Sequence, residues 1–69
     1  MEWFEKLRLL RAKEKWSLAY VAERIGISRP TAERHENGGT ITLDLMERYC
    51  ELYKVSGGVL FFDKTDRLQ

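Results

Sequence analysis

The sequence predicts an all-α domain, and three features of the chain support that fold class. Apolar residues recur at spacings of three and four, which is the period of a helix with one buried face. A serine or threonine stands just before four of these apolar segments, where its hydroxyl can cap a helix. Glycines stand where segments end, at Gly26 and at Gly38-Gly39. We therefore expect one compact domain of five helices over residues 1–62, followed by a polar tail over residues 63–69.

The first two helices are separated by a capping serine. Residues 3–13 should form the first helix, because Trp3, Leu7 and Leu10 fall on one face. Ser17 then provides an N-cap for a second helix over residues 18–25. The residues of this second helix that should lie in the core are Val21, Ala22 and Ile25.

The three remaining helices also begin after capping residues. They are expected over residues 29–36, 43–53 and 57–62. Their caps are Ser28, Thr42 and Ser56. Two consecutive glycines weaken the last of these helices. The inner face of the fourth helix should contain Leu43, Met46, Cys50 and Tyr53, with Tyr49 beside it.

The composition excludes several classes of protein. The chain has 69 residues, of which 43% are hydrophobic and 33% charged, so it is too apolar to be a disordered protein. No apolar run approaches the roughly 20 residues that cross a bilayer, and the first residues lack a signal-peptide pattern. We therefore expect a cytoplasmic protein without a membrane contact.

One cysteine and one histidine limit the available chemistry. Cys50 cannot form an internal disulfide and should be a small buried thiol. His35 should be buried or half-buried, with a pH-sensing role as the less favoured alternative. Together these two residues cannot supply the about four ligands of a structural zinc site. Since no nucleophile–base pair or phosphate-binding glycine loop is present, we predict no metal, no cofactor and no enzymatic activity.

The charge is distributed unevenly along the chain, although the net charge is only +1. Residues 1–35 contain eight Lys or Arg and five Asp or Glu, whereas residues 36–69 contain four and six. The first half therefore has a charge of +3 and the second half of −2. This asymmetry is compatible with one half that faces nucleic acid.

The segment WSLAYVAERIGISRPTAERHENG, residues 16–38, indicates two short helices around a tight turn. It resembles the lambda-repressor-like helix-turn-helix domains, the Cro/CI or xenobiotic-response-element group of bacterial and phage regulators. The resemblance extends over about residues 7–60. The matching positions are Val21-Ala22, the turn glycine Gly26, the pair Ile27-Ser28, and Glu36-Asn37-Gly38 at the end of the recognition helix.

The resemblance implies that the third helix reads double-stranded DNA in the major groove. The residues expected to read bases are Arg29, Pro30, Thr31, Glu33 and Arg34. Because an arginine can contact guanine at O6 and N7 together, a G-containing half-site follows. Contacts with phosphates are expected at Ser17, Ser28, Asn37, Gly39, Thr40 and Thr42. The resemblance also implies a structural ion pair between Arg11 and Glu36, with no contact to DNA.

Two positions depart from the family pattern. Leu18 stands where family members commonly have a glutamine that contacts a phosphate and braces the recognition helix. Pro30 stands where many members have another glutamine. Since a proline disfavours helical conformation in the residue before it, the third helix could begin at Pro30 and not at Arg29.

The sequence leaves two functions open. The first is a transcriptional regulator, most simply a repressor of the phage or mobile-element type, that binds a palindromic operator as a homodimer. Val59, Phe61 and Phe62 are candidates for the dimer interface, and Trp3 with Phe4 forms a second candidate patch. The alternative is a protein-interaction module of the same fold, an antitoxin or a binder of another regulator, with weak DNA binding.

Overall fold

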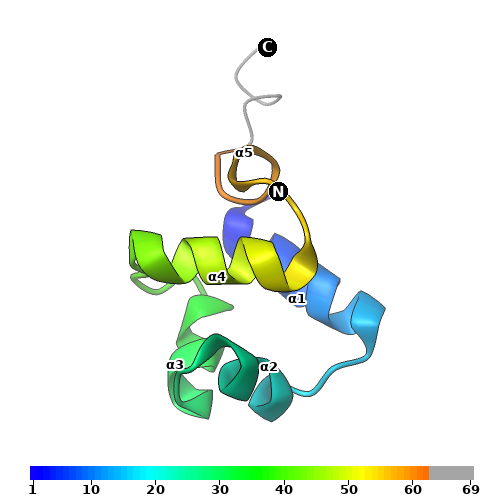
Figure 1. Cartoon of the computed structure of the whole chain (residues 1–69), viewed down its shortest axis with the longest axis vertical. Coiled ribbons are helices and arrows are strands. Elements are labelled where there is room, and N and C mark those ends of the chain that lie inside the picture. Colours follow the sequence, from blue (N-terminus) through cyan, green and yellow to red (C-terminus); the bar gives the residue numbers. More distant parts are fainter. Residues whose placement is uncertain (63–69) are drawn as a thin grey trace.

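The computed structural model describes residues 1–62, which form five α-helices and no strands (Figure 1). The helices are α1 (Trp3–Glu14), α2 (Leu18–Ile25), α3 (Arg29–His35), α4 (Leu43–Tyr53) and α5 (Gly57–Leu60). In Figure 1, α2 and α3 lie together at one end, α4 crosses the middle, and α5 lies at the opposite end near the N-terminus. The all-α prediction is confirmed, and the tail predicted over residues 63–69 lies outside the described residues.

The predicted helix boundaries agree closely with the structure. The bounds of α2 and α4 are as expected, and α1 is one residue longer than predicted. The predicted third helix was one residue too long, because Glu36 is the C-cap of α3. The predicted fifth helix was two residues too long, because the amides of Phe61 and Phe62 both donate to the Gly57 carbonyl and close the last turn. Among residues 1–62, no helix has the length and apolarity that a membrane span requires.

Hydroxyl caps determine where four of the five helices begin. The Oγ of Ser17 accepts the Tyr20 amide at 3.0 Å, and the Oγ1 of Thr42 accepts the Leu45 amide at 3.3 Å. Ser28 and Ser56 cap α3 and α5 in the same way. Each bond satisfies an amide that the first helical turn leaves without an intrahelical partner. The sequence therefore specifies the helix starts locally.

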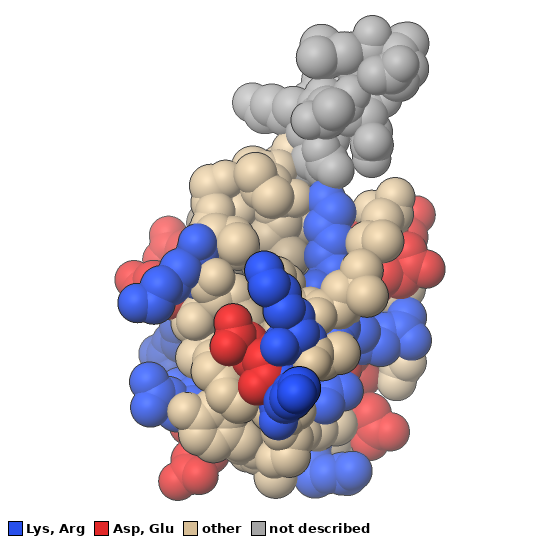
Figure 2. All heavy atoms as spheres, turned by 90° about the vertical axis from the view of Figure 1, so that its right-hand side faces the viewer, with Lys and Arg blue, Asp and Glu red and all other residues tan. Residues whose placement is uncertain are grey.

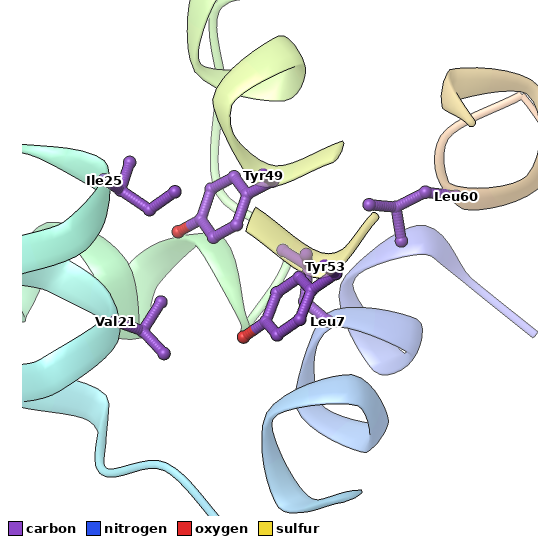
Figure 3. Packing of buried hydrophobic residues seen from close by; sticks show 6 residues of the cluster. All are labelled: Leu7, Val21, Ile25, Tyr49, Tyr53 and Leu60. Atoms are coloured by element: carbon purple, nitrogen blue, oxygen red, sulfur yellow. The ribbon is translucent and has the colours of Figure 1, made fainter. Parts of the chain in front are cut away.

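The core lies between α1, α2, α4 and α5. Its buried members are Leu7, Val21, Ile25, Tyr49, Tyr53 and Leu60. Figure 3 shows Val21 and Ile25 of α2 pointing toward the two tyrosine rings of α4, with Leu60 on the other side of those rings. Because two of the six residues are tyrosines, α4 supplies much of the apolar area that these helices bury.

The predicted inner face of α4 is correct for Tyr53, which is buried, and wrong for Leu43. Leu43 is 66% exposed, and Tyr49, which was placed beside that face, is completely buried. Cys50, predicted as a buried thiol, is half-buried. The helix is turned so that the Tyr49 hydroxyl can reach His35, a contact that apolar spacing alone cannot reveal.

The aromatic residues near the N-terminus do not form the exposed patch that was considered for them. Trp3 and Phe4 are half-buried and pack edge to face, with ring centroids 5.5 Å apart. Trp3 also lies against Phe61, at 5.6 Å between centroids. These rings therefore close the core where α1 meets α5.

Arg11 and Glu36 connect three separate segments of the chain. The Nε of Arg11 donates to Oε2 of Glu36 at 2.8 Å, and its Nη2 donates to Oε1 at 3.0 Å. Its Nη1 donates to the Trp16 carbonyl at 3.1 Å. The carboxylate of Glu36 is buried, and its hydrogen bonds raise the pKa of Arg11. The pair thus fixes the ends of α1 and α3 and the turn before α2.

His35 connects α3 to α4. Its Nδ1 lies 3.0 Å from the Tyr49 hydroxyl, and the two rings meet edge to face. Both side chains are completely buried. Burial lowers the pKa of His35, and the positive charge of Arg34 lowers it further. These two effects favour the neutral imidazole inside the fold. The burial of His35 agrees with the expectation from the sequence.

Breaking the Arg11–Glu36 pair should destabilise the fold strongly. Arg11→Met leaves the Glu36 carboxylate buried without its partner, so the free energy of unfolding should fall by about 3 kcal/mol, the low end for such pairs because Arg11 is 26% exposed. Urea denaturation measures this change. Arg8→Met, at an exposed position of the same helix, should change stability by less than about 0.5 kcal/mol. Equal losses in both variants would contradict the role of the pair.

Acid should destabilise the fold through His35. Because its pKa in the folded state lies below the ordinary value of 6.5, the unfolded chain binds the proton more readily. The free energy of unfolding should therefore be highest above about pH 6.5 and fall as the pH drops below that value. His35→Leu should flatten the profile between about pH 5.5 and 7.5. If the free energy of unfolding of the wild type does not change with pH in this range, acid does not destabilise the fold through His35.

Candidate nucleic-acid interface

The short helix α3 turns one side to the core and the other to solvent. Ala32 and His35 are buried, whereas Arg29, Glu33 and Arg34 are exposed. Pro30 stands in the first turn, where its missing N–H leaves no hydrogen bond unmade. The helix nevertheless includes Arg29, so the predicted displacement of its start to Pro30 does not occur.

The exposed face of α3 has a central row of residues with one row on either side of it. Pro30 and Arg34 are four residues apart and project away from the buried Ala32. On one flank, Nη1 of Arg29 lies 3.9 Å from Oε1 of Glu33, an exposed ion pair. On the other flank, Thr31 is half-buried. The structure thus presents Pro30 and Arg34 most directly, while Arg29 is engaged by an acidic neighbour.

Thr31 is held by the cap of α3. Its Oγ1 lies 2.8 Å from Oγ of Ser28, which also accepts the Thr31 amide at 3.3 Å. This pairing uses one of the two O–H donors within the helix start, and Thr31 is half-buried. Thr31 is therefore the least available of the five residues predicted to read bases.

Arg34 is positioned by the close approach of Gly39. The Gly39 amide donates to the Arg34 carbonyl at 2.9 Å. A side chain at Gly39 would overlap Cγ of Arg34 and lie 3.0 Å from its carbonyl oxygen. Because it has no Cβ, Gly39 leaves room for the Arg34 stem in its present position, and a larger residue would force that stem to move.

The residues predicted to contact phosphates lie at helix starts and in the loop before α4. The hydroxyls of Ser17 and Thr42 accept helix amides, and each keeps its O–H as a donor. Asn37 donates its Nδ2 to the Glu33 carbonyl at 3.0 Å, so its side chain closes the end of α3. Thr40 is exposed and Gly39 is half-buried.

Sequence reasoning missed a residue that supports the turn between α2 and α3. Nη1 of Arg48 donates to the Ile25 carbonyl at 2.9 Å. A Cβ at Gly26 would lie 3.1 Å from the same Nη1. Asp44, four residues earlier on α4, holds the same guanidinium at 3.3 Å. The Asp44–Arg48 spacing was a visible signal of the ion pair, but its contact with a distant turn was not.

The residues considered for dimerisation do not form one patch. Val59 borders a groove with Leu9 of α1, and Phe62 borders another groove with Leu43 of α4. Phe61 is half-buried against Trp3. The two exposed members of the predicted set therefore belong to different surfaces.

Positive and negative side chains are mixed over the face seen in Figure 2, where blue Lys and Arg lie beside red Asp and Glu. The same mixture occurs on α3, in which Glu33 lies between the two arginines in sequence and pairs with one of them. Leu18, at the first position of α2, is half-buried, and its side chain has no group that could bind a phosphate. Non-specific attraction to DNA should therefore be weak.

Comparison with known proteins agrees with this geometry. The model of a family described as helix-turn-helix domain matches residues 5–60, most of the 69-residue chain. No curated protein and no solved structure matches the chain. Domains of this kind are DNA-binding modules and not enzymes. On the extent of that match, the chain belongs to a helix-turn-helix domain family of the XRE and Cro/CI kind.

Proposed function

We propose that this chain is a sequence-specific transcriptional regulator that reads double-stranded DNA with α3. The observation that carries the proposal is the outward, exposed pair Pro30 and Arg34, with the stem of the arginine lying close to Gly39. An exposed guanidinium at this position can contact O6 and N7 of one guanine, and an adjacent proline ring can pack on a thymine methyl. The hydroxyls of Ser17 and Thr42 would donate to phosphates on either side.

The finer features of this function follow from the same surface. A seven-residue helix reads few base pairs, so useful affinity requires two copies on a two-fold-symmetric operator. A cytoplasmic homodimer that blocks transcription, as a phage or mobile-element repressor does, is the simplest regulator of this size. Selection from a random duplex pool tests the proposal, since a palindromic motif should be enriched.

A second function has its own support. The Arg29–Glu33 pair leaves α3 with a net charge of only +1, which suits a protein partner as well as DNA. In that case the chain would act as an antitoxin or would occlude another regulator. Unselective binding that disappears steeply with added salt would favour this alternative over the regulator.

Removing the outward arginine should reduce discrimination. Arg34→Ala should cost about 1–3 kcal/mol at a guanine in the selected motif and little at a mutated motif. Glu33→Gln should strengthen binding to both DNAs, because it frees Arg29 and removes a negative charge near phosphates. Fluorescence anisotropy with matched duplexes measures both effects. Arg8→Ala, which removes the same charge from α1, is the control, and equal losses from Arg8→Ala and Arg34→Ala would refute base reading.

A methyl group at position 39 should act on DNA binding through Arg34. Gly39→Ala forces the Arg34 stem to move, so specific binding should weaken in the same way as in Arg34→Ala, and stability should fall by about 1–3 kcal/mol. Gly58→Ala is the matched control, since its Cβ would meet only the Ser56 hydroxyl at 4.0 Å. That variant should bind normally. Unchanged binding by folded Gly39→Ala would show that the loop does not position Arg34.

A further inference from the structure

The outward face of α1 carries a short row of three exposed residues. Glu5, Leu9 and Lys13 follow one another at intervals of four, which places them on one side of the helix. Leu9 is 55% exposed at the centre of this row. Met1 lies beside Leu9, with Glu5 and Arg8 bordering the same shallow depression, so Met1 adds apolar surface at the start of the helix.

Leu9 also borders an apolar groove between α1 and α5. The groove has a volume of about 220 Å³ and is lined by Lys6, Leu9, Leu10, Val55, Val59 and Leu60. Nζ of Lys6 donates to the Val59 carbonyl at 2.7 Å and ties the two helices together. Because Val59 is exposed beside this groove, the apolar surface continues from α1 onto α5.

The charges of the row are arranged symmetrically about Leu9. Glu5 precedes Leu9 by four residues and Lys13 follows it by four, so each lies about 6 Å from Leu9 along the helix axis. A two-fold axis at Leu9 therefore places each Glu5 level with the Lys13 of a second, antiparallel copy. We propose that this face of α1, with Val59 at its edge, is the surface through which two copies of the chain associate.

Other registers of two α1 helices are disfavoured by their charges. A pairing centred near Leu10 would place Arg8 opposite Lys13, and one centred on Arg8 would place two copies of Arg8 together. The groove beside Phe62 is equally unsuited to self-association. It is lined by Glu47 and Glu51, so a two-fold contact there brings carboxylates together.

The interface should be weak by itself. One face of a 12-residue helix buries less than the roughly 1,200 Å² of a stable complex, so we expect a dissociation constant above about 1 µM. The biological use of such a dimer rests on the proposed function, because two half-sites on one operator would hold the copies together. The association itself is measurable without DNA.

Sedimentation equilibrium of the full chain, from about 10 µM to 1 mM, tests the surface. The wild type should dimerise, and Leu9→Glu should weaken dimerisation at least tenfold. Lys13→Glu should do the same, because it places carboxylates opposite the Glu5 of the other copy. The double variant Glu5→Lys with Lys13→Glu should restore dimerisation, since it exchanges the two charges and keeps their complementarity.

Three results would overturn the proposal. The first is a wild type that remains monomeric at about 1 mM. The second is a double variant that dimerises no better than Lys13→Glu while circular dichroism shows both folded. The third is loss of the dimer in Leu43→Glu and not in Leu9→Glu, which would assign the interface to the α4–α5 groove. The affinity of monomeric Leu9→Glu for a single half-site should equal that of the wild type. This measurement tests the proposed DNA recognition independently of the dimer interface.

Discussion

The fold depends on one carboxylate, that of Glu36, and on the guanidinium that meets it. Arg11 uses its three donor nitrogens on two segments, the end of α3 and the turn before α2. A buried pair of this kind adds little net stability, because the cost of removing both charges from water offsets their attraction. The pair instead sets the orientation of α3, because it holds the end of this helix against α1.

Helix positions could be predicted from the sequence more reliably than helix orientations. The starts of α2 and α4 depend on Ser17 and Thr42, whose hydroxyls act on amides three residues away. Information of that range is visible in a sequence. The orientation of α4 depends on the contact between Tyr49 and His35, which are fourteen residues apart and belong to different helices. Apolar spacing takes no account of the polar partner that a buried tyrosine hydroxyl requires. It therefore placed Leu43 inward and Tyr49 beside the inner face, whereas Tyr49 faces His35 in the structure.

The candidate site follows the same division. The motif predicted which residues would lie on α3, and all five are there. Their availability depends on neighbours, and only the local ones are visible in the sequence. The Arg29–Glu33 spacing and the Ser28 cap beside Thr31 are local signals, whereas the close approach of Gly39 to Arg34 is not. The glycine at position 39 looked like part of a stop signal, and its close approach to the arginine stem appears only in three dimensions.

The chemistry of the helix caps has a consequence for the response of this fold to acid. Serine and threonine hydroxyls do not titrate, so the first turns of α2, α3, α4 and α5 keep their caps at low pH. The start of α1 differs, because the Glu5 carboxylate accepts the Glu2 amide there. The Asp44–Arg48 and Arg29–Glu33 ion pairs are exposed, so among the described residues the buried carboxylate contact that acid can disrupt is the Arg11–Glu36 pair, which joins α1 to the end of α3. An acid-expanded form of this protein should lose the attachment of α1 while the turn from α2 into α3 still holds its local shape.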